Sequence, residues 1–514
     1  MVLAGLGYVY LILFGLSLDI LVAIPSDDAF YYFKIARNVV HGLGCTFDGI
    51  ARTNGFHPFW MVCILPVFWL FGGDLEIPVR VILAFNGLVC ITTLVLLYRI
   101  VHRHVAVGVG SVAAAVCLLP NILRAMTNGM ETGLMLFALT CLLWLCYRKR
   151  IHDPAVGPGM TFLFGILVGI VCLCRLDTVF ILAAAASLTV VYTLLRQITL
   201  RACLAWLIVV SGGFGLIVVP YLTWNLAYFG HIMPISGAIK SSFPLVRASL
   251  TLPYDMGFGA ALLALLWLLM VVLVVIDSNK DRRLERLLAS PVTMLTLACT
   301  YHFAYVFLFL TWGIYWWHFA VYGLTLAVAL AQVVDRCTAS RPHVRPAVIG
   351  TIAVAVTAVA LALNIHESRI KGAQHRGWLE GAEWAREHTS PEAVFAIKDA
   401  GLFGYFSDRQ TINLDGKANG YAYRSALRNN DVQGYLRRCD VDYVAKVSAP
   451  YNASTCWIVI PRVCQSPVIL VMNERQEVFH SRAFTVKAGR VGRPAAASFG
   501  IWRFSEAGAR NADG

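Results

Sequence analysis

Residues 26–60 read SDDAFYYFKIARNVVHGLGCTFDGIARTNGFHPFW and lie between two long apolar segments. Asp27 and Asp28 stand where a membrane-spanning helix over 3–24 is expected to end. The residues from Asp28 to Val40 have helical spacing and are rich in aromatic side chains. Ionisable side chains at the end of a span are costly unless they have partners or a function. The interpretation of the whole chain therefore depends on where this segment lies relative to the membrane.

The composition is that of a membrane protein. Of the 514 residues, 58% are hydrophobic and 14% are charged, whereas soluble proteins have about 25% charged residues. The net charge is +13. A basic excess can indicate nucleic-acid binding, but here Lys and Arg cluster between apolar segments, which is typical of cytoplasmic loops. We expect a polytopic α-helical membrane protein that lies in a lipid bilayer and binds no nucleic acid.

Eleven segments are apolar and long enough to cross a bilayer, which takes roughly 20 residues. These predicted transmembrane helices are 3–24, 77–98, 105–122, 130–147, 159–175, 177–195, 203–224, 256–276, 291–311, 317–335 and 347–364. The basic clusters between them are 99–103, 148–150, 196–201, 280–286 and 336–345. With eleven spans and a cytoplasmic N-terminus, every one of these clusters lies inside, as the positive-inside rule requires.

The apolar segment 57–72 is excluded from the spans. A crossing there would put the later basic clusters on the wrong side or would reverse the N-terminus. We interpret 57–72 as a helix in the outer interface, with Trp60 and Trp69 as interfacial anchors. The first outer loop is then 25–76.

The chain changes character after about residue 365. Residues 1–365 form the predicted membrane domain, and 366–514 form a polar tail long enough for one domain. We predict a helix over 376–388 and strands over 393–397, 410–414, 441–447, 457–460 and 499–504. The topology places this small α/β domain outside the cytoplasm. A disulfide between Cys456 and Cys464 would suit an oxidising compartment and would leave Cys439 over, so the pairing stays open.

The ionisable residues expected on the outer face come from six places in the sequence, and the predicted topology gathers them at one membrane surface. This convergence is the strongest chemical signal in the chain. The residues are Asp27, Asp28, Lys34, Arg37, Arg52, His57, Arg124, Glu131, Arg175, Asp177, Lys240 and His318.

Each of these positions also has a structural explanation. One acid of the Asp27–Asp28 pair could have no role beyond capping a helix, and the same holds for Glu131 at the start of the next span. Arg175 and Asp177 could pin a tight turn between spans, or the guanidinium could bind an anion.

Two further residues are ambiguous in the same way. Lys240, in YFGHIMPISGAIK (228–240), is either a solvated loop lysine or a phosphate partner. His318, in WGIYWWHF (312–319), lies in an aromatic cluster that is typical of an interface belt or of sugar stacking.

The order of these features resembles the GT-C membrane glycosyltransferases that use polyprenyl-phosphate sugars, which include protein mannosyltransferases, aminoarabinose transferases and arabinofuranosyltransferases. The matching segments run in order along the chain: DDAFYYFKIARN, TNGFHPFW, NGMETGL, RLD, YFGHIMPISGAIK, DAGLFGYF and NLDG. Each is unspecific alone, and the series is specific to the superfamily.

The resemblance implies an inverting transfer of a sugar from a lipid phosphate to an acceptor, which is a glycan, a lipid or a protein. It implies that the first outer loop supplies the base, for which Asp27 is the first candidate and Asp28 its neighbour or substitute. Arg175, Lys240 and, less directly, Lys34 are candidates for the donor phosphate. The remaining candidates would shape the pocket: Asn54, His57, Glu131, Asp177 and His318.

We expect no cofactor, because residues 27–34 contain no DxD spacing and the chain has no CxxC pair; a divalent metal stays open. Polyprenyl chemistry and the charge pattern favour a bacterial inner membrane, while Asn452 begins a glycosylation sequon that matters only in a eukaryotic lumen. The alternatives are a transporter or flippase for a lipid-linked substrate, whose charges usually lie near the midplane, and a polyprenyl-binding scaffold without activity.

Overall fold

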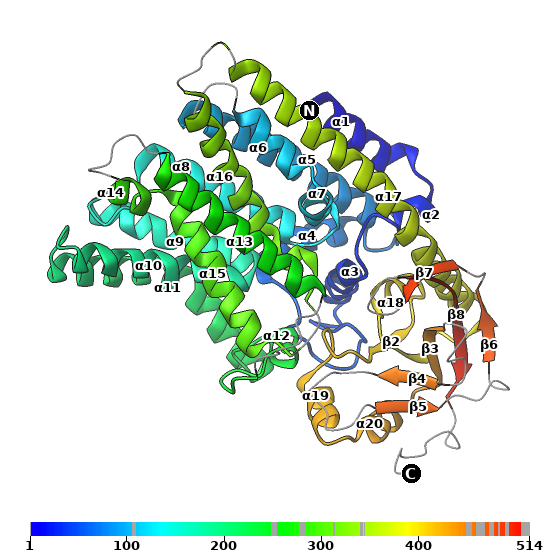
Figure 1. The fold of residues 1–514 in the computed structure, drawn as a ribbon. Coiled ribbons are helices and arrows are strands. Elements are labelled where there is room, and N and C mark those ends of the chain that lie inside the picture. Colours follow the sequence, from blue (N-terminus) through cyan, green and yellow to red (C-terminus); the bar gives the residue numbers. More distant parts are fainter. Residues whose placement is uncertain are drawn as a thin grey trace.

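The long helices of the protein form a bundle, and a smaller domain of helices and strands lies at one end of it (Figure 1). This computed structural model describes residues 2–104, 109–247, 254–276, 283–311, 314–339, 343, 345–448, 455–458, 468–471, 477–481, 484–488 and 493–504.

Among the described residues, seven helices are long and apolar enough to cross a membrane, two of them together with the 3-10 turn that precedes them. They are α5 (Ile77–His104), α8 (Thr132–Lys149), α10 (Phe180–Leu194), α11 (Leu200–Phe229), α13 (Tyr254–Val275), α15 (Pro291–Phe309) and α16 (Ala320–Thr338). Shorter apolar helices cover Val2–Gly15, Pro58–Phe71, Pro158–Cys174 and Arg345–Ala360. The protein is thus a polytopic helical membrane protein, and the total of eleven spans stays a prediction.

The first predicted span, 3–24, is interrupted. It consists of α1 (Val2–Tyr10), a π-helical turn (Leu11–Gly15) and α2 (Leu18–Leu21), with extended backbone at Leu16. The carbonyl groups released by this break need partners. Arg80 of α5 supplies them, because its guanidinium donates to the carbonyls of Ile12 (2.7 Å) and Leu16 (2.6 Å).

The expected continuous helix over 105–122 differs from the structure in its described part. Here α6 (Gly110–Cys117) and α7 (Pro120–Thr127) are separate helices, and Leu119 between them is extended. Pro120 explains the break, because proline lacks an N–H group and disfavours a helical residue before it, yet is well placed at the start of a helix.

The segment 57–72 forms helix α4 (Pro58–Phe71), as predicted. The expectation that Trp60 is an interfacial anchor is wrong, because its ring is fully buried and stacks on Phe85 at a centroid distance of 6.1 Å. Trp69, on another face of α4, is 77% exposed. The position of α4 at the outer interface stays a prediction.

Helix α17 (Arg345–His388) runs without interruption from the last predicted span into the predicted helix 376–388. The sheet that follows has the order β2-β1-β3-β8-β6, in which β1 (Val394–Ile397) pairs in parallel with β2 (Gln410–Asn413) and β3 (Tyr443–Ser448). The last long strand, β8 (Arg493–Arg503), runs antiparallel to β3, to β6 (Glu477–His480) and to β7 (Phe484–Ala488). Four of the predicted strands are therefore confirmed.

The remaining elements of this domain are short. Helix α18 (Gly401–Phe406) connects β1 to β2, and α19 (Tyr421–Arg428) and α20 (Val432–Arg438) lie between β2 and β3. The fifth predicted strand, 457–460, overlaps β4 (Thr455–Ile458), which pairs with β5 (Val468–Val471). Cys464, half of the proposed disulfide, and Asn452 of the sequon lie outside the described residues.

Helices α9 (Pro158–Cys174) and α11 pack through glycines. A Cβ atom added to Gly165 would lie 2.2 Å from the carbonyl oxygen of Val210, and one added to Gly213 would lie 2.2 Å from that of Phe162. Small residues of this kind let the backbones of membrane helices approach closely. Gly212, one residue earlier, would meet only a ring atom of Phe162 at 3.8 Å.

We predict that Gly213→Ala destabilises the protein by about 1–3 kcal/mol, the usual effect of overpacking a close contact. Gly212→Ala is the matched control and should be neutral or slightly stabilising, because alanine favours the helix. Thermal unfolding of both variants in the same detergent measures the difference. Equal unfolding temperatures would contradict the close backbone packing of α9 and α11.

Candidate active site

Asp27 opens helix α3 (Asp27–Val40) and joins it to the C-terminal domain. The two oxygens of its carboxylate accept hydrogen bonds from the backbone N–H groups of Gly401 (3.1 Å) and Leu402 (2.8 Å), the first residues of α18. Free N–H groups at a helix start attract a carboxylate. Burial, and after it the charge of Asp399, raises the pKa of Asp27 to about 8. Both oxygens of Asp27 are thus already engaged.

Asp28 contacts a cation from another loop. The Nζ atom of Lys417 lies 3.0 Å from Oδ1 of Asp28 and 3.0 Å from Oδ2 of Asp415. Burial raises the pKa of Asp28, but Lys417 and Lys240 outweigh this effect and hold that pKa below its usual range. The side chain of Asp28 is 19% exposed, whereas that of Asp415 is 1% exposed. Asp28 is therefore an ionised carboxylate that remains partly open.

The segment TNGFHPFW (53–60) contacts the residues around Asp28 and Lys240 through Asn54 and Gly55. A Cβ atom on Gly55 would lie 2.1 Å from the carbonyl oxygen of Lys417, so only glycine fits against the Lys417 backbone. The buried side chain of Asn54 accepts from the N–H group of Ile235 (2.8 Å) and donates to the carbonyl of Met233 (3.4 Å). Asn54 thus holds the start of α12 (Ile235–Lys240).

Lys240 ends α12, and the N–H group of Thr311 donates to its carbonyl oxygen at 2.8 Å. Burial, and after it the charge of Lys417, lowers the pKa of the Lys240 ammonium to about 8, although Asp28 and Asp415 act in the opposite direction. No carboxylate of the described residues lies within 4 Å of this ammonium. The charges of Asp28 and Asp415 therefore act on Lys240, but neither of these residues forms an ion pair with it.

A second charged cluster surrounds Arg175, which follows α9. Its guanidinium contacts Glu131 (3.1 Å), both oxygens of Asp177 (3.0 Å each) and the hydroxyl of Thr132 (3.3 Å). The hydroxyl of Tyr32 donates to the other oxygen of Glu131 at 2.9 Å. The predicted Arg175–Asp177 turn contact is therefore present, and Glu131 completes it.

Two histidines border this second cluster. Nε2 of His57 lies 3.6 Å from Glu131, and burial lowers the pKa of His57 against the opposing charge of Glu131. His318 lies in the 3-10 turn Trp316–Phe319, with its Nδ1 atom 3.1 Å from the carbonyl oxygen of Tyr315. The structure thus brings together Arg175, Glu131, Asp177, His57 and, across a small pocket, His318.

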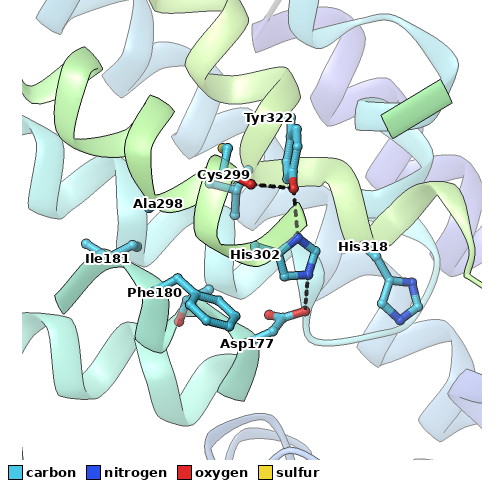
Figure 2. Close-up of a pocket in the computed structure, with 10 residues that line it drawn as sticks. Asp177, Phe180, Ile181, Ala298, Cys299, His302, His318 and Tyr322 are labelled. Atoms are coloured by element: carbon cyan, nitrogen blue, oxygen red, sulfur yellow. Dashed lines mark hydrogen bonds and ion pairs between the residues drawn. The ribbon is translucent and has the colours of Figure 1, made fainter. Parts of the chain in front are cut away.

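Figure 2 shows this pocket, which is lined by Asp177, Phe180, Cys299, His302, His318 and Tyr322 among others. Its empty volume is about 300 Å³, part of which is open solvent. His302 lies between Asp177 and Tyr322, at 3.7 Å from the carboxylate and 2.9 Å from the hydroxyl.

Lys34 is not brought to either cluster. Its Nζ atom lies 3.8 Å from Asp408 of the C-terminal domain, which also forms an ion pair with Arg37. Burial lowers the pKa of Lys34 to about 8, and Asp408 opposes this effect. Lys34 therefore connects α3 to the end of α18 and is separated from the other candidate phosphate ligands.

Two residues of the site, His302 and Lys417, were not predicted from the sequence. His302 is an ionisable residue inside the predicted span 291–311, and such a position by itself indicates a functional candidate. Lys417 lies in the quoted turn NLDGKANG, but only its position next to Asp28 reveals its importance. Among the described residues, no group of three or more His, Cys, Asp or Glu side chains is arranged to hold a metal ion.

Comparison with known proteins places this geometry in a known fold. A family model described as a domain of unknown function (DUF8728) matches residues 364–486. The sequence matches no curated protein.

Solved structures match over most of the chain. ArnT from Cupriavidus metallidurans bound to undecaprenyl phosphate is 12% identical, with a TM-score of 0.53, and the match covers 97% of each chain. The oligosaccharyltransferase AglB from Archaeoglobus fulgidus, in complex with an inhibitory peptide and a dolichol-phosphate, is 14% identical with a TM-score of 0.53; the match covers 86% of this chain and 69% of that one. Both are GT-C membrane glycosyltransferases, and the present chain has the GT-C fold.

The raised pKa of Asp27 predicts a pH-dependent stability. Because the folded protein holds this proton more tightly than the unfolded chain, the stabilisation is complete below the usual pKa near 4 and is lost as the pH rises through about 8. We expect the unfolding temperature of the wild type to fall more steeply between pH 6 and 9 than that of Asp27→Asn. The difference between the two melting curves isolates Asp27 from Lys240 and Lys34, and parallel curves would contradict the prediction.

Proposed function

We propose that the protein is an inverting glycosyltransferase that moves a sugar from a polyprenyl-phosphate donor to an extracytoplasmic glycan, lipid or protein acceptor. The proposal places it in the inner membrane of a bacterium, with the active site and the C-terminal domain outside the cytoplasm. The observation that carries it is that the partly exposed carboxylate of Asp28 lies near enough to Lys240 for each charge to shift the pKa of the other, while no described carboxylate forms an ion pair with Lys240. The fold is shared along its length with an undecaprenyl-phosphate complex.

In the proposed reaction, the acceptor oxygen attacks the anomeric carbon while the bond from that carbon to the phosphate oxygen breaks. The acceptor proton passes to a carboxylate, and the polyprenyl phosphate leaves with the electron pair. Phosphate is a good leaving group, so the protein has to supply position, a base and a cation for the developing charge.

We assign the base to Asp28. A general base must be ionised and must have an oxygen within reach of the proton. The lowered pKa of Asp28 favours the ionised form, and its partly exposed side chain leaves room for an acceptor. Asp27 was the first candidate from the sequence, but both of its oxygens accept backbone N–H groups and its raised pKa favours the protonated form. Asp27 then acts by holding α18, and with it the start of α3, in place.

We assign the donor phosphate to Lys240. Arg175 already contacts Glu131 and Asp177, so its positive charge is compensated on both sides. Lys34 pairs with Asp408 instead. Asn54 holds the start of α12 and thereby positions Lys240 at its end. The other pocket candidates, His57, Glu131, Asp177 and His318, surround Arg175.

Asp28→Asn should lower kcat by about 10²–10⁴-fold, because it removes the base while keeping the shape of the side chain. Asp27→Asn should cost less, since an amide oxygen still accepts one of the two N–H groups. Transfer of labelled sugar from an undecaprenyl-phosphate sugar, measured in reconstituted membranes, separates the two. Asp74→Asn is the matched control, because Asp74 also accepts two backbone N–H groups at a helix start, in this case that of α5.

Full transfer by Asp28→Asn would refute the assignment of the base. A greater loss for Asp27→Asn than for Asp28→Asn would transfer the role to Asp27. Absence of transfer by the wild type from every lipid donor would favour a transporter, a flippase or a non-catalytic scaffold.

Lys240→Gln should weaken the binding of undecaprenyl phosphate by about 10- to 150-fold, because a charge-assisted hydrogen bond is worth about 1.5–3 kcal/mol. Lys34→Gln is the control and should leave this affinity unchanged, although it removes the same charge from the same protein. Binding titrations at two salt concentrations measure both effects. Equal losses for the two variants would indicate a general effect of charge.

A further inference from the structure

The pocket beside Arg175 contains a chain of hydrogen bonds that fixes the tautomer of a neutral His302 (Figure 2). The hydroxyl of Tyr322 donates its only proton to the carbonyl oxygen of Cys299 at 2.7 Å. Its oxygen can therefore only accept from Nδ1 of His302, at 2.9 Å. The proton of the neutral imidazole is thus on Nδ1, and Nε2 carries a lone pair.

This lone pair faces another acceptor. Nε2 of His302 lies 3.7 Å from Oδ2 of Asp177, which is longer than a hydrogen bond of about 2.7–3.2 Å. Two acceptors that face each other repel unless donors lie between them. His302 is buried, whereas the side chain of Asp177 is 28% exposed, so the pocket opens on the Asp177 side.

We propose that Asp177 and His302 form a recognition site for two adjacent hydroxyl groups of a sugar. One hydroxyl donates to Nε2 of His302, and its neighbour donates to Oδ2 of Asp177, which also keeps its hydrogen bond from Arg175. The ring of Phe180, 5.9 Å from that of His302, provides an apolar wall for the carbon face of the sugar.

The location of the pocket favours the donor sugar over the acceptor as its ligand. Asp177 also binds Arg175 at 3.0 Å, and Arg175 is near enough to Lys240 for its charge to lower the pKa of that ammonium. Resting on the proposed function, the inference is that the diol belongs to the sugar carried by the lipid phosphate. His302 and Asp177 then select the donor, and neither takes part in bond making.

Binding measurements test this without requiring turnover. The protein in nanodiscs is titrated with undecaprenyl phosphate and with undecaprenyl-phosphate mannose, glucose and arabinofuranose. We expect at least one sugar lipid to bind about tenfold or more tightly than the bare lipid phosphate, and its analogue lacking one of the two adjacent hydroxyls to lose that advantage.

His302→Asn is the decisive variant, because its amide keeps a donor near Nδ1 and removes the acceptor at Nε2. It should bind the sugar lipid and the deoxy analogue equally, with the affinity for bare undecaprenyl phosphate unchanged. His152→Asn is the matched control, since His152 is another buried histidine, held by the carbonyl of Ala289 at 3.0 Å in a different pocket. It should preserve the wild-type discrimination.

The inference is overturned if no sugar lipid binds more tightly than the bare lipid phosphate, or if His302→Asn keeps the discrimination. It is also overturned if the variant weakens the bare lipid and the sugar lipid equally, which would indicate a charged His302 or a pocket that holds only water. Discrimination without any transfer would support the pocket and refute the proposed transferase activity, so the two failures are distinct.

Discussion

The contact between the start of α3 and the C-terminal domain is the constraint on which the site depends. Two neighbouring aspartates make it in two different ways. Asp27 accepts the first N–H groups of α18, and Asp28 pairs with Lys417 from the turn after β2. Because consecutive helical residues diverge by about 100° around the axis, one acid can accept the N–H groups of α18 while the other faces Lys417.

The close approach of backbones makes this contact specific. A Cβ atom on Gly401 would lie 2.0 Å from the carbonyl oxygen of Asp27, and one on Gly55 would lie 2.1 Å from that of Lys417. Residues 25–76 and the C-terminal domain thus contact each other closely through glycines on both sides. The domain therefore contributes to the candidate site, because it supplies Lys417, whose charge helps to lower the pKa of Asp28.

The balance of charges distinguishes the cations from one another. Arg175 lies between Glu131 and Asp177, Lys417 between Asp28 and Asp415, and Lys34 beside Asp408. A cation that contacts two carboxylates has little attraction left for a further anion. Lys240 is influenced by the charges of Asp28 and Asp415 but forms no ion pair with either. Burial of such a charge is costly without a partner, and a phosphate ligand would remove that cost.

Much of the fold could be predicted because membrane helices appear in the sequence as long apolar segments and strands as short segments in which apolar and polar residues alternate. The bounds of α8, α9 and α15 lie within two residues of those expected. The errors fall where tertiary contacts override the pattern. Pro120 splits a predicted span, and Arg80 compensates a break in the first helix. Phe85 covers Trp60, which the charge-based topology and the usual preference of tryptophan had assigned to the interface.

The residue types and their order along the chain already indicated the GT-C architecture, the outer acids and the cations. Hydrophobicity, charge asymmetry and turn residues act locally, so they can be recognised without knowing which segments meet. The partners had to come from the folded structure, because Asp28 and Lys417 are 389 residues apart and Asp177 and His302 are 125 apart in sequence. Whether an acid caps a helix, stays open to solvent or shares a pocket with a histidine depends on which distant atoms lie within a few ångströms, and only packing in three dimensions brings those atoms together.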